Sequence, residues 1–177
     1  PQKKNFTLVS SYTHAVEIGN EPLLIGERIN PTGKKKLKEA LRNEDMNYIL
    51  SEAVNQAEKG VHILDVNVGL PEIDEGKMLT DAVCALQAVT PLPLQIDTSN
   101  AEAMASALRR YNGKAMINSV NGKRESMEAV FPLAKKYGGL VVALGVLDGG
   151  DIDILKTAAV LVRDTLGGGK HLKGKVV

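Results

Sequence analysis

Five short apolar runs, separated by segments of helical periodicity, constrain the fold of this chain more than any other feature. Each run has the length of a strand and is mostly unbroken, as expected of strands buried on both faces of a sheet. The runs occupy residues 22–26, 61–66, 92–96, 114–118 and 139–144. Strands that alternate with helices build a parallel sheet with right-handed crossovers. The sequence therefore predicts an α/β fold with parallel strands and helices outside the sheet.

The segments between the runs carry apolar residues three and four positions apart, the spacing of one helix face. The stripes are Met46, Ile49, Leu50, Ala53, Val54 and Ala57; then Met78, Leu79, Ala82, Val83 and Leu86; then Ala101, Ala105 and Leu108; and last Met127, Val130, Phe131 and Ala134. Cys84, the single cysteine, lies in the second of these helical segments and is predicted to be a buried, inert thiol. A further helix is predicted over 151–166, with Asp151 as its N-cap.

Two architectures fit this alternation: a doubly wound open sheet and a (β/α)₈ barrel. No G-x-G-x-x-G follows the first run, so the dinucleotide-binding open sheet lacks its main signature. A full barrel takes about 250 residues, and the 177 residues here hold about five of the eight units. We expect TIM-barrel-like units over residues 1–144, as a partial barrel or an open sheet. Residues 145–177 are expected to form a divergent helix and a glycine-rich tail.

The composition excludes several classes of function. Lys plus Arg number 22 and Asp plus Glu number 21, so no overall charge drives binding to nucleic acid or to a membrane surface. Aromatic residues make up 3% of the chain, which argues against base stacking. No apolar run approaches the roughly 20 residues that a transmembrane helix needs, and no secretory signal is visible. A lone cysteine fits a reducing compartment, so a cytoplasmic protein is expected.

Polar side chains follow four of the five runs, at the point where each strand is expected to end. They are Glu27, Arg28 and Asn30; Asp65 and Asn67; Asp97, Thr98, Ser99 and Asn100; and Asn118, Ser119 and Asn121. Because the carboxyl ends of parallel strands meet at one edge, we expect a shared site there. Carboxylates accept N–H bonds from an amino-pyrimidine edge, and amides both donate and accept. The site is therefore predicted to bind a neutral heterocycle. No His joins it, which argues against a metal site or a Ser-His-Asp hydrolase.

Some of these residues also fit purely local roles. Ser99 or Asn100 suits the N-cap of a helix that begins near Ala101, and Asn30 suits the turn that follows it. Residues 72–76 are interpreted as an acidic loop and helix start. The basic run at 33–39 is either a solvated helix face or a surface that attracts the glutamate tail of a folate.

Four motifs resemble those of a known family: "IGERINPTG" (25–33), "ILDVNVG" (63–69), "IDTSN" (96–100) and "MINSVNG" (116–122). In this order they are similar to the pterin-binding domains of cobalamin-dependent methionine synthases and of methyltetrahydrofolate:corrinoid methyltransferases. A more distant resemblance is to dihydropteroate synthases. The resemblance runs from about residue 22 to residue 144, so residues 1–144 are expected to be the pterin-binding portion.

The resemblance implies a (β/α)₈ barrel that binds the pterin ring of a folate at its C-terminal face. The candidate substrate-binding residues are Glu27, Asn30, Asp65, Asn67, Asp97, Ser99, Asn118 and Ser119, of which Asp97 and Asn118 are the catalytic candidates. The implied reaction transfers the N5 methyl group of methyltetrahydrofolate to cob(I)alamin in methionine synthesis. Folate is then the substrate, cobalamin is carried by a partner domain or corrinoid protein, and this chain holds no metal. An amine leaves poorly, so N5 needs protonation or a hydrogen bond.

The chain departs from the family pattern at about Gly145. The family continues with three more strands, one ending in an Asp-Pro motif that binds pterin and another carrying an Asn that contacts N5. Neither motif occurs here, so a truncation after the fifth strand is expected, with open strand edges that favour a homodimer. The alternatives are a non-catalytic pterin-binding fragment completed by another chain, a dihydropteroate synthase-like enzyme, and a scaffold without a ligand. The late basic residues of the synthase family have no counterpart here.

Overall fold

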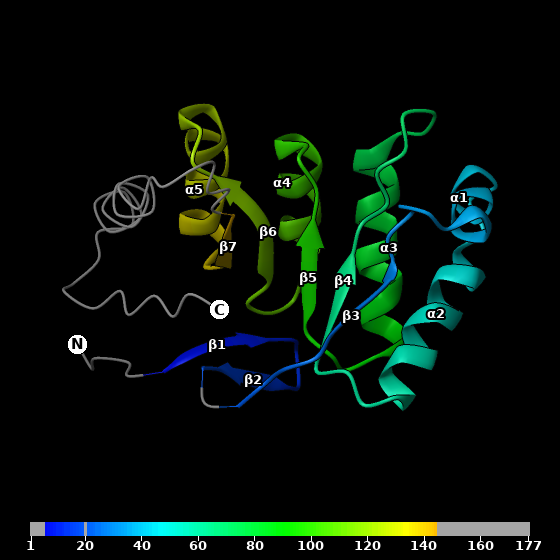
Figure 1. The fold of residues 1–177 in the computed structure, drawn as a ribbon, viewed down its shortest axis with the longest axis horizontal. Coiled ribbons are helices and arrows are strands. Elements are labelled where there is room, and N and C mark those ends of the chain that lie inside the picture. Colours follow the sequence, from blue (N-terminus) through cyan, green and yellow to red (C-terminus); the bar gives the residue numbers. More distant parts are fainter. Residues whose placement is uncertain (1–5, 20, 145–177) are drawn as a thin grey trace.

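The computed structural model describes residues 6–19 and 21–144, and within them it confirms the α/β fold (Figure 1). A five-stranded parallel sheet has the order β3-β4-β5-β6-β7. Its strands are β3 (Ile25–Ile29), β4 (Ile63–Val66), β5 (Leu94–Asp97), β6 (Met116–Asn121) and β7 (Leu140–Leu144). The helices are α1 (Lys35–Arg42), α2 (Met46–Glu58), α3 (Glu75–Val89), α4 (Ala101–Arg110) and α5 (Arg124–Tyr137). The predicted helix and tail in 145–177 lie outside the described residues.

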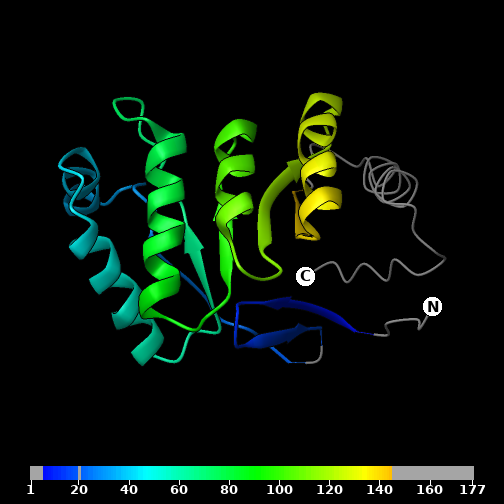
Figure 2. The same cartoon turned by 180° about the vertical axis from the view of Figure 1, so that it is seen from behind.

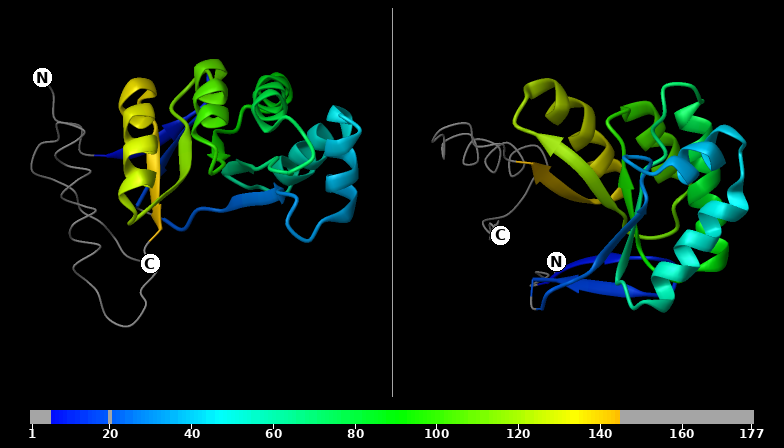
Figure 3. Two further views of the ribbon diagram at one scale, coloured as in Figure 1. Left: turned by 90° about the horizontal axis from the view of Figure 1, so that it is seen from above. Right: turned by 45° about the vertical axis from the view of Figure 1, so that its right-hand side comes forward.

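Helices α2 to α5 stand side by side on one face of the sheet (Figure 2) and follow an arc around the strands when seen from above (Figure 3). The main core lies between this helical layer and the sheet. It contains the predicted stripe of α3 together with strand residues that point toward the helices, such as Leu64, Leu94, Ile96 and Ile117. The arrangement is a partial barrel of five strands.

A hairpin that the sequence analysis did not predict lies at the amino end of the sheet (Figure 1). Strands β1 (Thr7–Ser10) and β2 (Ala15–Ile18) pair antiparallel. Val9 of the hairpin packs with Ile63 and Met116, and so builds a second apolar cluster on the inner face of the parallel sheet. Main-chain hydrogen bonds join Ser10 and Lys114 in both directions, at 2.9 and 3.0 Å. The hairpin therefore covers the amino end of the partial barrel.

All five strands differ from their predicted bounds, and in β3, β4 and β6 the polar residues expected after the strand lie inside it. The first strand covers 25–29 in place of 22–26, so Glu27 and Arg28 belong to it. Asp65 lies within β4, and β6 runs on through Asn118 to Asn121. The cause is that side chains alternate between two faces, and only the face toward the helices is apolar along the whole strand. In β3 and β6 the apolar run therefore ends before the strand does, and in β4 it contains the inward-facing Asp65.

The prediction for Cys84 is wrong, because this thiol is exposed. The buried stripe of α3 passes through Val83 and Leu86, and Cys84 lies on the outward side of the helix. Asp74 and Asn100 cap α3 and α4 through their side chains, as the polar residues before these helices indicated. In the described ranges, no helix is long and apolar enough to cross a membrane.

Candidate functional site

Four polar residues of the central strands, Asp65, Gln95, Asp97 and Asn118, lie on the inner face of the sheet, above the apolar cluster that the hairpin covers. Asp65 pairs in register with Gln95, and Asp97 pairs in register with Asn118. Because successive strand residues point to opposite faces, Gln95 and Asp97 share the face that Asp65 occupies. The inner face is thus layered along the strands, with an apolar floor, then Asp65 and Gln95, then Asp97 and Asn118 at the carboxyl end.

Asp65 is a buried carboxylate with only part of its hydrogen-bonding capacity used. The residue is 1% exposed, and its Oδ1 accepts a hydrogen bond from Gln95 Nε2. Its Oδ2 is buried and has no hydrogen-bond partner within the described residues. Burial raises the pKa of Asp65 most, and the negative charges of Asp97 and Glu27 raise it further, while the side chains of Gln95 and Asn118 lower it; the resulting pKa is about 7. The Asp65 carboxyl group therefore keeps its proton to a higher pH than an exposed aspartate does.

Asp97 ends β5 and lies half-buried at the carboxyl end of the inner face. We call this end the mouth and define it by Glu27, Asn30, Asp65, Asn67, Asp97 and Asn118. Its Oδ2 accepts a hydrogen bond of 2.9 Å from Asn67 Nδ2, while Asn67 Oδ1 accepts one of 3.0 Å from the Gly69 N–H. Asn67 is thereby held with its donor toward the carboxylate. Burial raises the pKa of Asp97 most, the Asn67 hydrogen bond lowers it, and the charges of Glu27 and Glu75 raise it further.

Glu27 and Asn30 form a second polar pair at the edge of the mouth. Asn30 Nδ2 donates to Glu27 Oε1 at 3.0 Å, and Asn30 Oδ1 accepts from the Thr32 N–H at 3.0 Å. The turn role predicted for Asn30 is confirmed by the second bond. Ser99 is exposed and Ser119 is half-buried, and the described structure gives neither side chain a hydrogen bond to the other polar residues of the site.

Two residues that sequence reasoning missed belong to this site. Gln95 is the direct partner of Asp65, and Glu75 accepts a hydrogen bond from Thr98 Oγ1 next to Asp97. Gln95 stands two positions before Asp97 in one strand, so the two-residue repeat of a strand was a signal for it. Glu75 lies in the predicted acidic helix start, and only the tertiary fold brings it to Asp97.

The mouth is acidic, and none of the charges that shift its two aspartates is positive. The charged groups acting on Asp65 and Asp97 are carboxylates in every case. Among the described residues, no three His, Cys, Asp or Glu side chains are grouped so as to hold a metal ion. Carboxylate oxygens without a cationic partner accept N–H bonds strongly. The arrangement therefore suits a neutral ligand that presents several N–H donors.

Comparison with known proteins agrees with this chemistry. Residues 26–151 match the family described as pterin binding enzyme. Methionine synthase of Mycobacterium leprae (strain TN) is 32% identical over 146 residues, which is 77% of this chain and 12% of the relative. Methionine synthase of Mycobacterium tuberculosis (strain ATCC 25618 / H37Rv) is 30% identical over 143 residues, with the same coverage. The chain thus spans about an eighth of the length of these relatives.

Dihydropteroate synthases are among the solved structures with the same fold. The enzyme from Vibrio fischeri ES114 superposes with a TM-score of 0.66 at 18% identity, covering 91% of this chain and 62% of that one. The enzyme from Xanthomonas albilineans with 4-aminobenzoic acid gives 0.60 at 20% identity, covering 88% and 57%. At these identities the likeness establishes the fold.

Proposed function

Because the chain belongs to the pterin binding enzyme family, we propose that it binds methyltetrahydrofolate by its pterin ring and supports transfer of the N5 methyl group to cob(I)alamin. The observation that carries the proposal is the acidic mouth, in which Asp65 and Asp97 lie in adjacent layers of the inner face and the charged groups that shift their pKa values are carboxylates. A pterin presents an amino-pyrimidine edge whose N–H groups suit such acceptors. The two methionine synthase relatives favour this reaction over others that use a pterin.

In this proposal each residue of the mouth makes a different contact with the ligand or with a neighbouring side chain. Asp97 accepts N–H bonds from the ring, and Asn67 keeps that carboxylate in place through the 2.9 Å hydrogen bond. Asn118, the register partner of Asp97, offers an amide that donates and accepts at the same level. Asp65 lies one layer deeper, where its free Oδ2 accepts from a ligand N–H or from a water that the ligand holds. Glu27, Asn30, Ser99 and Ser119 would border the ring.

The leaving amine needs a proton or a hydrogen bond at N5 while the methyl group departs. When cobalamin is bound on a partner domain or corrinoid protein, its cobalt supplies the nucleophile that accepts the methyl group. The part of this chain is to orient the ring, exclude water around it and stabilise charge at N5. Asp97 and Asn118 are the residues we propose for these roles.

Calorimetric titration with methyltetrahydrofolate tests the proposal directly. We expect saturable binding by the 177-residue chain. When cob(I)alamin is added, we expect the NMR signal of the N5 methyl group of the folate to disappear. Asp81→Asn serves as the control for altered charge, because Asp81 pairs with Lys77 on the exposed side of α3. No heat at millimolar ligand would contradict the proposal.

A second candidate, a non-catalytic pterin-binding fragment completed by another chain, is favoured by one observation. The described sheet ends at β3 on one side and β7 on the other, so each of these strands pairs on one side only within the described residues. Unpaired strand edges favour association with another chain. Binding without methyl transfer, together with a dimer in solution, would favour this candidate. Formation of dihydropteroate from 4-aminobenzoate and a hydroxymethyldihydropterin diphosphate, with release of diphosphate, would instead favour a synthase-like enzyme.

A further inference from the structure

A buried hydroxyl next to Asp97 connects the end of β5 to the start of α3. Thr98 is 5% exposed, and its N–H donates to the Asn118 carbonyl oxygen at 3.2 Å, so the parallel ladder continues one residue beyond β5. Because successive residues of an extended chain point to opposite faces, Thr98 faces the helical layer while Asp97 faces inward. Thr98 Oγ1 donates a hydrogen bond to Glu75 Oε1, in the first turn of α3. The residue beside Asp97 is therefore tied to a helix.

The direction of this hydrogen bond follows from a second contact of the same hydroxyl. Thr98 Oγ1 accepts a hydrogen bond of 2.9 Å from the Asn100 N–H. A hydroxyl has one proton to donate, and an ionised carboxylate only accepts, so the proton of Thr98 goes to Glu75. The partial positive charge at the start of a helix also suits a negative side chain in that turn. Glu75 is therefore held in place from both sides.

Glu75 also lies next to the loop that orients Asn67. A Cβ added at Gly69 would meet Glu75 Oε1 at 3.5 Å and Asn67 Oδ1 at 3.4 Å, so the two side chains flank the same glycine. Asn67 in turn donates to Asp97 at 2.9 Å. Among the described residues, none of the ion pairs within 4 Å includes Glu75. Its charge is therefore not neutralised by a cation, and it lies beside both contacts that fix Asp97.

We propose that Glu75 is a positioning residue for the Asp97 carboxylate, and that it acts through Thr98. This inference rests on the proposed function and adds to it a residue that does not contact the ligand. By holding the Thr98 hydroxyl, Glu75 keeps the end of β5 in register with Asn118. The Asp97 carboxylate then stays where the Asn67 amide donates to it and where the pterin ring would meet it.

The charge of Glu75 has an effect that a purely structural contact would not have. Burial raises the pKa of Asp97 most, the Asn67 hydrogen bond lowers it, and the charges of Glu27 and Glu75 raise it further. Asp65 also faces Asp97, from one layer deeper in the sheet. Of these acids only Glu75 lies outside the mouth, so its charge can be removed without altering a residue proposed to contact the ring.

The first test compares two variants of Glu75 at pH 8. Glu75→Ala removes the acceptor of Thr98, and we expect it to bind methyltetrahydrofolate about fivefold more weakly, the factor that one hydrogen bond contributes. Glu75→Gln keeps an acceptor oxygen and should recover most of that affinity. Thr98→Val, which removes the hydroxyl, should weaken binding by a factor similar to that of Glu75→Ala. Calorimetry measures the dissociation constants, at a temperature where urea denaturation shows each variant to be folded.

The second test measures how the affinity changes between pH 8 and pH 5.5. Glu75→Gln removes a negative charge, so the pKa of Asp97 falls and its carboxylate stays ionised to a lower pH. The loss of affinity on acidification should then be about twofold smaller than in the unaltered chain, the size of one interaction between partly exposed charges. Asp65 and Glu27 are the same in both proteins, so the difference between the two pH profiles reports the charge of Glu75.

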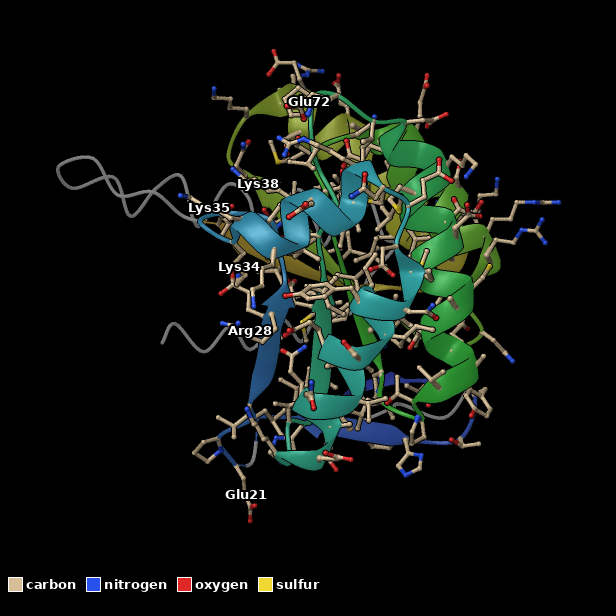
Figure 4. The ribbon with its side chains drawn as sticks, turned by 90° about the vertical axis from the view of Figure 1, so that its right-hand side faces the viewer. Glu21, Arg28, Lys34, Lys35, Lys38 and Glu72 are labelled. Atoms are coloured by element: carbon tan, nitrogen blue, oxygen red, sulfur yellow. The ribbon has the colours of Figure 1, made fainter. Side chains whose placement is uncertain are left out.

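Glu72→Gln is the matched control, because it removes one negative charge three residues away. Glu72 is exposed and pairs with Arg42 at 3.2 Å, and Figure 4 shows its side chain at the top of the molecule, above Lys38 of α1. We expect this control to keep the affinity and the pH profile of the unaltered chain.

The outcomes separate this inference from the proposed function. If Glu75→Ala lowers the free energy of unfolding but not the affinity, the contact with Thr98 serves the fold alone, and the inference is wrong although the pterin proposal stands. If Glu72→Gln changes the pH profile as much as Glu75→Gln does, the effect is one of net charge, and the inference fails. If the unaltered chain binds no methyltetrahydrofolate, the proposed function fails and the inference fails with it.

Discussion

At the amino end of the parallel sheet the polar groups pair within the protein, whereas at the carboxyl end a buried carboxylate oxygen has no partner among the described residues. The Tyr111 hydroxyl donates to the Ser10 carbonyl oxygen at 2.8 Å and accepts from the Leu94 N–H at 3.0 Å. Ser11 Oγ likewise donates to the Pro91 carbonyl oxygen. At the other end, Asp65 Oδ2 is orphaned and Asp97 stands among carboxylates.

This difference between the two ends indicates that the amino end stabilises the fold and that the carboxyl end is suited to bind a ligand. Paired polar groups at the amino end hold the hairpin over the apolar floor and leave nothing for a ligand to satisfy. Unpaired acids at the carboxyl end cost stability, and a ligand with N–H donors would remove that cost. In barrels of this kind the carboxyl end carries the chemistry and the amino end carries stability. Variants at the two ends should therefore change different properties.

The largest effect is expected at the amino end, from Gly113→Ala. A Cβ at this position would overlap the Ser10 carbonyl oxygen, which is backbone of the hairpin and has no room to move. We expect a loss of about 3 kcal/mol in the free energy of unfolding, measured by urea denaturation. Affinity for methyltetrahydrofolate should be unchanged at a temperature where the variant is folded.

The matched control is Gly33→Ala, at a position with open space around it and a φ of +71°. Backbone strain alone costs about 1–2 kcal/mol there. If Gly113→Ala lowers the free energy of unfolding no more than this control does, the hairpin does not pack tightly against Gly113. The amino end would then contribute less to stability than we infer.

The next largest effect is the pH dependence that Asp65 confers. Its pKa is about 7 in the folded chain and 3.8 as the ordinary value, so between these values the folded state binds more protons than the unfolded state. Stability then falls as the pH rises. Between pH 5 and pH 8 the loss is roughly 2.5 kcal/mol, and above pH 8 it should not grow further.

Asp65→Asn should remove this loss, whereas Asp81→Asn on the exposed side of α3 should retain it. Urea midpoints at pH 5 and pH 8 measure the effect in all three proteins. If the unaltered chain has the same urea midpoint at pH 5 and at pH 8, the pKa of Asp65 is not raised in the folded state, and the prediction is wrong.

A smaller effect, on binding in place of stability, is expected for Asp97→Asn. The change replaces one acceptor oxygen by an amide donor that faces the N–H groups of the ligand. A hydrogen bond to a charged group contributes roughly 2 kcal/mol, so affinity for methyltetrahydrofolate should fall about 30-fold. Unfolding stability should hold or rise, because burial already disfavours the charge. A large loss of stability with unchanged affinity would mean that Asp97 stabilises the fold and does not bind the ligand.

The sequence predicted the α/β fold class and the parallel strands because buried strands leave unbroken apolar runs. It did not predict the hairpin, whose strands of four residues are mostly exposed or half-buried. It placed Asp65 at a strand end because polarity alone does not distinguish a buried acid from an exposed one. The pairing of Asp65 with Gln95, and the position of Glu75 beside Asp97, depend on register and on contacts between distant segments, which a pattern along one chain does not encode.

The smallest effect is expected for Asn67→Ala, which removes the donor that favours the ionised form of Asp97. Asn67 is half-buried and its loss should cost under about 1 kcal/mol in unfolding stability.

The larger consequence of Asn67→Ala concerns the pH dependence of ligand binding. The Asn67 hydrogen bond lowers the pKa of Asp97 against burial and the nearby acids, so without it the pKa rises further and the carboxylate takes up a proton at a higher pH. Affinity for methyltetrahydrofolate should then fall more at pH 5.5 than at pH 8, by calorimetry, whereas Asn112→Ala at the amino end should lower it at neither pH. If the affinity falls equally at pH 5.5 and pH 8, Asn67 contacts the ligand directly, and ligand binding does not depend on the ionisation of Asp97.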